Sequence, residues 1–84
     1  MIKVGDIVVA IAGKEKNQKF VVVDCDDNYF YIANGKRVKI SKPKKKNAKH
    51  IQKASKLIFP LSELNCLDEM KVNASIRKFL KEED

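Results

Sequence analysis

The chain has 84 residues, of which 44% are hydrophobic, so it is long enough for one small domain with its own core and too short for two. This hydrophobic content excludes a chain that is disordered by composition. The net charge is +7, and ten of the 18 basic residues fall within 36–56, where there is no acidic residue. Such a basic block indicates a polyanionic partner, with nucleic acid first and an acidic membrane surface second.

Four short runs, each of a length that suits a β-strand, follow one another from the N-terminus. They are DIVVAIA at 6–12, KFVVVDC at 19–25, NYFYIA at 28–33 and KRVKIS at 36–41. Turn-forming residues and no helical pattern lie between them. This order predicts a mainly β fold, either a small antiparallel barrel or a strongly bent sheet, and KASKLIF at 53–59 would add a fifth strand.

The pair Asn34-Gly35 favours a type I′ hairpin turn between the third and fourth runs, because both positions of that turn need a positive φ. A two-residue loop places Tyr31 opposite Val38, with both side chains pointing inward. The other face of this hairpin would carry Phe30, Ile32, Arg37 and Lys39. Such a mixed face would either stack RNA bases or be covered by the C-terminal segment.

The last part of the chain has a helical pattern. After Pro60, four apolar residues recur at every third position, which predicts a helical turn or two: Leu61, Leu64, Leu67 and Met70. Asn73 is a predicted N-cap for a helix over 74–83 that packs on the barrel. We therefore expect a barrel over 1–59, including a basic loop at 42–56, and a C-terminal helical segment over 60–84.

The segment 4–32 runs from a strand through a glycine with lysines to an apolar strand, a turn and another strand. In this order it resembles the KOW motif of ribosomal proteins and transcription factors, with Gly5-Asp6 as the first turn and Gly13-Lys14 as the central loop. Residues 33–50, ANGKRVKISKPKKKNAKH, are similar to KOW-containing large-subunit ribosomal proteins of archaea and eukaryotes and to their small bacterial relatives. The resemblance implies an SH3-like barrel that binds RNA, with ribosomal RNA or the ribosome as the partner.

Two residues depart from the motif. Asn17 stands where KOW loops commonly carry a second glycine, and Phe20 stands where they carry a small residue. Asparagine tolerates the left-handed conformation better than most residues, so we expect Asn17 to keep the turn.

The candidate RNA-binding residues are the cations that a barrel would bring near residues 42–50, KPKKKNAKH, which we call the lysine-rich stretch. They are Lys14, Lys16, Lys19, Arg37, Lys39, Lys42, Lys44, Lys45, Lys46, Lys49 and His50. Lysines on a strand edge and an adjoining loop can neutralise several phosphates and release their counterions. Arg37 can in addition stack on a base or hold one phosphate with two bonds. The alternative is that the run 42–50 is a solvated tail, and that His50 only packs where the loop rejoins the fold.

Other functions find little support in the sequence. No catalytic motif is visible, so we do not expect an enzyme or a small-molecule substrate. Cys25, Cys66 and His50 lack the spacing of metal ligands, so we expect no metal and no cofactor. We see no secretory signal and no apolar stretch of about 18 residues, and we expect a cytoplasmic protein with no membrane partner. The alternative function is a protein–protein interaction module of the translation or transcription machinery, and the oligomeric state is left open.

Overall fold

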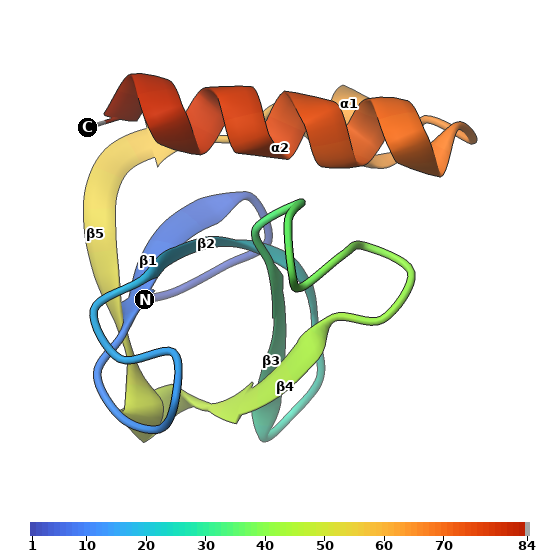
Figure 1. Ribbon diagram of the computed structural model, residues 1–84. Helices are drawn as coiled ribbons and strands as arrows, with labels where there is room; N and C mark the ends of the chain where they lie inside the picture. The colour runs from blue at the N-terminus through green and yellow to red at the C-terminus, as the bar shows by residue number, and fades with distance from the viewer. Residues whose placement is uncertain (84) are drawn as a thin grey trace.

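The computed structural model describes residues 1–83 and consists of one antiparallel sheet with a helix across one end (Figure 1). The strands are β1 (Asp6–Ala10), β2 (Lys19–Cys25), β3 (Tyr29–Ala33), β4 (Lys44–Asn47) and β5 (Ile51–Ile58), in the spatial order β4-β3-β2-β1-β5. The turn η1 (Ala48–His50) joins β4 to β5, and the helices α1 (Leu61–Leu64) and α2 (Glu69–Glu83) follow. The sheet curls into an SH3-like barrel, which confirms the predicted fold class. Asp84, the last residue of the predicted C-terminal segment, lies outside the described residues.

The apolar residues form two cores, one on each side of β1 and β2. The core inside the barrel consists of Val8, Ala10, Phe20, Val22, Ile32, Ala33, Val38 and Ile51. The core under α2 consists of Ile7, Val21, Phe59, Val72, Ile76 and Leu80. Successive residues of a strand point to opposite faces, so Ile7 reaches the helix while Val8 points into the barrel. The continuous apolar character of β1 and β2 follows from burial on both faces.

Two turns of the predicted KOW motif have the backbone that the motif needs. Gly5 has a φ of +95°, and its N–H donates to the carbonyl oxygen of Val22 at 2.8 Å. Asn17 has a φ of +73°, and its N–H donates to the carbonyl oxygen of Ala10 at 2.7 Å. The expectation that Asn17 keeps the left-handed turn is therefore confirmed. Phe20, the other departure, is fully buried in the barrel core.

The predicted hairpin at Asn34-Gly35 is wrong. Gly35 has a φ of +76°, but Asn34 lacks the positive φ that a type I′ turn requires. Instead the Oδ1 atom of Asn34 accepts hydrogen bonds from the backbone N–H groups of Lys36 and Val38, at 2.9 and 3.1 Å. Asparagine offers the backbone such local partners in place of a strand ladder. Residues 34–43 are therefore a loop, the run 36–41 is not a strand, and the strand that pairs with β3 is β4.

The predicted N-cap at Asn73 is also wrong, because α2 begins at Glu69. The Oδ1 atom of Asp68 accepts from the N–H groups of Met70 and Lys71, at 3.1 and 3.3 Å, which is the bonding of an N-cap. Asn73 instead lies within the helix and is buried, and its Oδ1 atom accepts from the N–H of Ile40 at 2.9 Å. This bond fastens loop 34–43 to α2.

Candidate functional site

The lysine-rich stretch forms the edge strand of the sheet rather than a tail. β4 pairs antiparallel with β3, with Lys44 opposite Ile32 and Asn47 opposite Tyr29. η1 and β5 follow it directly, so the fold holds the stretch at both ends. Residues 42–56, predicted as a basic loop, thus contain β4, η1 and most of β5. Lysines also suit an edge strand for a structural reason, since their charge discourages pairing with another chain.

A shallow groove lies where loop 34–43 runs into β4. We call it the basic groove; it has a volume of about 300 Å³ and is lined by Arg37, Val38, Lys39, Lys42, Pro43 and Lys44. The four cations of this groove are exposed, whereas Val38 is buried and anchors the loop in the barrel core. The structure therefore brings together four of the predicted RNA-binding residues from two neighbouring segments.

Loop 11–18 is attached to β4 by an ion pair. The Nζ atom of Lys46 lies 3.0 Å from the Oε1 atom of Glu15, and each side chain is 16% exposed. The hydrogen bond from Lys46 lowers the pKa of Glu15, and the charges of Lys44 and Lys14 lower it further. Lys14 and Lys44 therefore lie near the same carboxylate, which brings the first loop beside the basic groove. Lys46 itself is half-buried and occupied by this pair.

Lys45 lies on the face of β4 opposite to that of Lys44 and Lys46. Its Nζ atom is 4.3 Å from the centre of the Tyr29 ring, and the Tyr31 hydroxyl donates to the Oδ2 atom of Asp26 at 2.8 Å. The half-buried rings of Tyr29 and Tyr31 thus face outward, and the predicted inward orientation of Tyr31 is wrong. Ile32 is instead fully buried in the barrel interior. The predicted mixed face fails because the real partner strand begins eight residues later than predicted, at Lys44.

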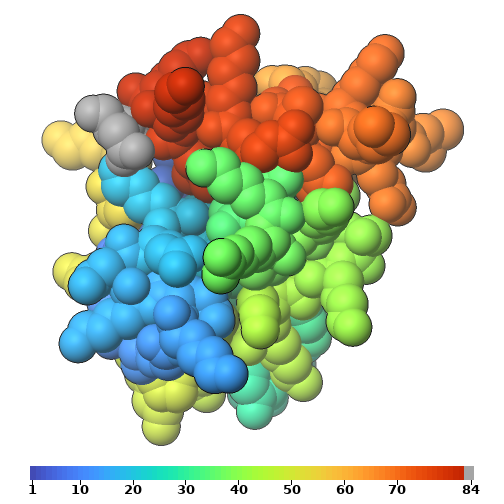
Figure 2. All heavy atoms as spheres, viewed as in Figure 1, coloured from blue at the N-terminus to red at the C-terminus, as the bar shows by residue number. Residues whose placement is uncertain are grey.

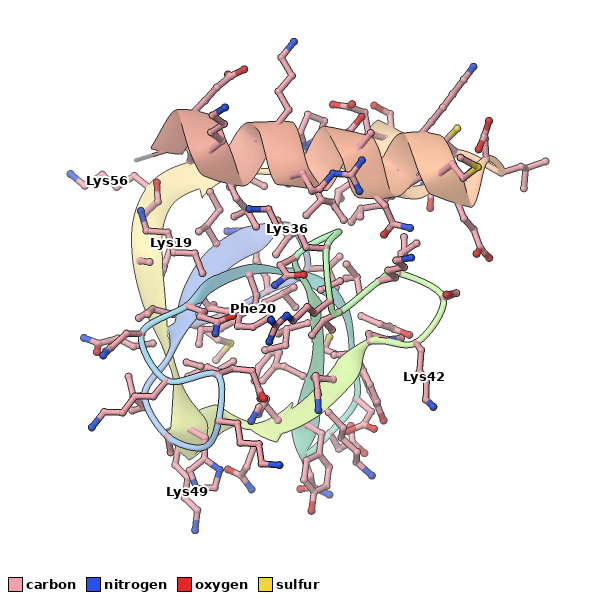
Figure 3. The ribbon with its side chains drawn as sticks, viewed as in Figure 1. Lys19, Phe20, Lys36, Lys42, Lys49 and Lys56 are labelled. Carbon is pink, nitrogen blue, oxygen red and sulfur yellow. The ribbon has the colours of Figure 1, made fainter. Side chains whose placement is uncertain are left out.

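The remaining predicted residues are spread over the molecule. Figure 3 shows Lys49 at the end of the barrel opposite α2, and the neighbouring His50 is exposed in η1. Lys16 is exposed in loop 11–18, and Lys19 is half-buried at the start of β2. Since Lys44 and Lys45 also lie on opposite faces of β4, the eleven predicted residues are not all on one face of the sheet.

A second hollow brings the predicted residue Lys19 together with three cations that the sequence did not single out. We call it the basic cleft; it has a volume of about 510 Å³ and is lined by Asn17, Gln18, Lys19, Asn34, Lys36, Arg77, Leu80 and Lys81. Figure 2 shows the segments that build it meeting on one face, with green loop 34–43 between the blue first loop and the red α2. Arg77 and Lys81 are four residues apart, so they share one face of a helix. That spacing was the available signal, but it becomes informative only once loop 34–43 is known to reach the helix.

Other chemistry finds no assembled site in the described part of the chain. Within residues 1–83, no group of three or more His, Cys, Asp or Glu side chains is arranged to hold a metal ion. Cys25 and Cys66 are both exposed free thiols. Over the same residues, neither helix is long and apolar enough to cross a bilayer.

Comparison with known proteins gives a relationship for the whole chain. No model of a known protein family matches it. The large ribosomal subunit protein eL14 of Staphylothermus marinus is 32% identical over an alignment of 84 positions that covers 96% of this chain and 88% of the relative. A likeness of this extent includes the barrel, the lysine-rich stretch and α2 together. The chain therefore belongs to the eL14 family of large-subunit ribosomal proteins, which confirms the resemblance to KOW-containing ribosomal proteins seen in its sequence.

Proposed function

We propose that the protein binds ribosomal RNA in the large ribosomal subunit, in a structural rather than a catalytic role. The relative from Staphylothermus marinus carries the name of a large-subunit ribosomal protein, and the similarity extends over nearly the whole chain. We accordingly expect the protein at the ribosome, in the cytoplasm.

The basic groove beside Lys14 is the observation that supports RNA binding by particular residues. Exposed cations at Arg37, Lys39, Lys42 and Lys44 line a hollow of about 300 Å³. Phosphates entering it would replace the mutual repulsion of these cations with attraction, and the release of counterions from the RNA would add affinity. Arg37 would grip one phosphate with two parallel hydrogen bonds or stack on an unpaired base.

The other predicted residues take different parts in this proposal. Lys46 holds loop 11–18 in place through Glu15, and Lys45 is stabilised over Tyr29 near the Asp26 carboxylate. Lys16, Lys49 and His50 would make peripheral contacts with a large RNA. Binding would then be led by shape and charge, with limited reading of bases.

Exchange of two groove lysines tests the proposal. We expect Lys42→Gln with Lys44→Gln to weaken binding to purified large-subunit ribosomal RNA about tenfold at about 0.15 M salt, and to flatten the slope of log K against log salt by about 1.5. The matched control is Lys53→Gln with Lys56→Gln, which removes the same charge from β5. Lys56 projects on the side of the molecule away from Lys42 (Figure 3). Equal losses from both pairs, or no loss from the groove pair, would contradict the assignment.

A contact with another protein is the second candidate, and one observation favours it. The apolar side chains of Leu57, Ile58 and Leu61 are 56%, 44% and 51% exposed. Ile58 and Leu61 both lie against Gly5, so they are neighbours across the junction of β5 and α1. Capture of partners from lysate separates the two functions, because partners that bind through RNA are lost on ribonuclease treatment and direct protein partners are retained.

A further inference from the structure

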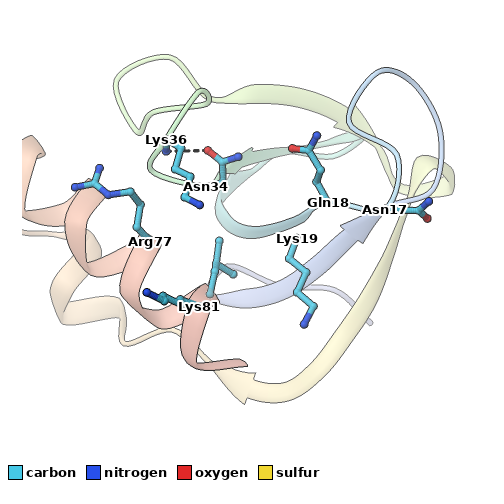
Figure 4. A pocket seen from close by; sticks show the side chains of 8 residues that line it. Asn17, Gln18, Lys19, Asn34, Lys36, Arg77 and Lys81 are labelled. Atoms are coloured by element: carbon cyan, nitrogen blue, oxygen red, sulfur yellow. Dashed lines mark hydrogen bonds between the residues drawn. The ribbon is translucent and has the colours of Figure 1, made fainter. Parts of the chain in front are cut away.

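The basic cleft is built from three parts of the chain that are distant in sequence. Figure 4 shows Lys19 and its neighbours from the end of the first loop, Lys36 from loop 34–43, and Arg77 and Lys81 from α2, around one hollow. Among the residues that the structure describes, its lining contains four cations and no acidic residue. The hollow has about 510 Å³, which is large enough for a phosphate with its neighbouring sugar.

The walls of the cleft are held in place by specific contacts. The Nη1 atom of Arg77 donates to the carbonyl oxygen of Gly35 at 2.6 Å. The side chain of Asn34 accepts from the N–H of Lys36 at 2.9 Å, drawn as a dashed line in Figure 4. A side chain at Gly35 would collide with the backbone of Asn73, so loop 34–43 packs directly on the helix backbone. These contacts therefore fix the positions of Lys36 and Arg77 relative to each other.

The chemistry of the lining favours an anion that has several oxygens. Lys36, Arg77 and Lys81 are all exposed, and charges of the same sign around one hollow repel one another until an anion enters. A guanidinium has five N–H donors in a rigid fork, so one bond to Gly35 leaves others for a ligand. Asn17, Gln18 and Asn34 add neutral donors, and Leu80 is the one apolar residue among the lining residues that the structure describes.

We propose that the basic cleft is a second RNA-binding site, which holds a backbone phosphate of the RNA between loop 34–43 and α2. Loop 34–43 supplies Lys36 to the cleft and Arg37 to the basic groove, so one strand crossing this loop would reach both hollows. α2 is then part of the binding surface as well as a cover for the barrel. This inference rests on the proposed binding of ribosomal RNA and adds α2 to the site.

The test compares two pairs of lysine exchanges that differ in place and not in charge. Lys36→Gln with Lys81→Gln removes two cations from the cleft, and Lys71→Gln with Lys78→Gln removes two exposed lysines of α2 that do not line it. We expect the cleft pair to weaken binding of large-subunit ribosomal RNA about tenfold at about 0.15 M salt, and the control pair to weaken it less than about threefold. Arg77 is left intact because its bond to Gly35 also stabilises the loop.

A second measurement follows the Nε–Hε resonance of Arg77 by NMR during titration of the intact chain with a ribosomal RNA fragment, inorganic phosphate or a polyglutamate peptide. A shift with RNA at lower concentration than with the other two supports the inference. A shift with phosphate or peptide but not with RNA overturns the RNA assignment. Equal affinities of the cleft and control pairs, with wild-type binding intact, overturn the cleft alone. Failure of the wild-type chain to bind ribosomal RNA overturns the proposed function as well.

Discussion

Lys46 of β4 and Glu15 of loop 11–18 form an ion pair of 3.0 Å that is largely shielded from water. The two residues are 31 positions apart, and their contact joins the first loop of the barrel to its edge strand. Lysines in a basic stretch are ordinarily read as ligands for a polyanion. Lys46 has instead a structural partner, so its exchange is expected to act through the loop as well as through charge.

A double-mutant cycle measures this pair. We expect Glu15→Gln and Lys46→Gln each to destabilise the fold, with a coupling free energy of about 1 kcal/mol in urea unfolding, because both side chains are only 16% exposed. Lys16→Gln, an exposed residue of the same loop, is the control and should change stability by less than about 0.5 kcal/mol. A coupling indistinguishable from zero would show that the ion pair does not hold the loop.

The same pair makes stability depend on pH. Lys46 lowers the pKa of Glu15 below its ordinary value of 4.5, so the folded state favours the carboxylate. The stabilisation is fully present above pH 4.5 and is lost as the pH falls through the lowered pKa. We therefore expect the difference in unfolding free energy between wild type and Glu15→Gln to be constant at neutral pH and to shrink in acid. Unfolding curves at a series of pH values check this, and a difference that grows in acid would have the wrong sign.

Most of the strands that were predicted correctly have a pattern that follows from burial. β2 was predicted at its observed bounds, and β1, β3 and β5 within two residues at each end. β1, β2 and β3 are apolar runs that end at turn residues, so the hydrophobic effect and local backbone preference agree there, whereas β5 is mostly exposed and is apolar only at its ends. The SH3-like closure of the barrel came from the resemblance to the KOW motif rather than from the pattern itself.

The errors lie where side chains compete with the backbone ladder. Residues 36–41 alternate like a strand because Val38 enters the barrel core and Ile40 packs under α2. The backbone N–H groups of these two residues, however, donate to the side chains of Asn34 and Asn73 and are not available to a neighbouring strand. β4 is the reverse case, since its lysines have low strand propensity and it forms only because β3 offers an open edge. The sequence could therefore name the basic residues of the site but not the face on which each one lies.

Exchange of two glycines for alanine separates backbone strain from packing. Gly13 and Gly35 have similar φ values of +85° and +76°, so each exchange carries the cost of a left-handed alanine, about 1–2 kcal/mol. A Cβ at Gly13 would meet only the end of the Lys46 side chain, its Nζ atom at 3.3 Å, whereas at Gly35 it would collide with the carbonyl oxygen of Asn73. We expect Gly35→Ala to be the more destabilising by a further 1–3 kcal/mol, roughly the cost of overpacking. Urea unfolding of both variants checks this. Equal losses of unfolding free energy would mean that loop 34–43 can move away from α2 without loss of stability.

The outward-facing tyrosines offer a direct test of the strand register. The hydrogen bond from the Tyr31 hydroxyl to Asp26 raises the pKa of Tyr31, because ionisation breaks the bond and brings two anions together. In a Tyr29→Phe background Tyr31 is the only tyrosine, so its pKa can be read by ultraviolet titration. We expect Asp26→Asn to lower that pKa towards its ordinary value.

The control for this titration is Asp27→Asn, which removes the same charge one residue further along the exposed β2–β3 turn. Asp27 makes no contact among those that raise the pKa of Tyr31, so this exchange should leave the titration nearly unchanged. A Tyr31 that titrates at its ordinary pKa in the Tyr29→Phe parent would place its hydroxyl away from Asp26. A raised pKa that Asp26→Asn does not lower would place the ring inside the barrel, because burial also raises the pKa of a tyrosine. Either result would contradict the pairing of Tyr31 with Lys45, and with it the placement of Lys44 and Lys45 on opposite faces of β4.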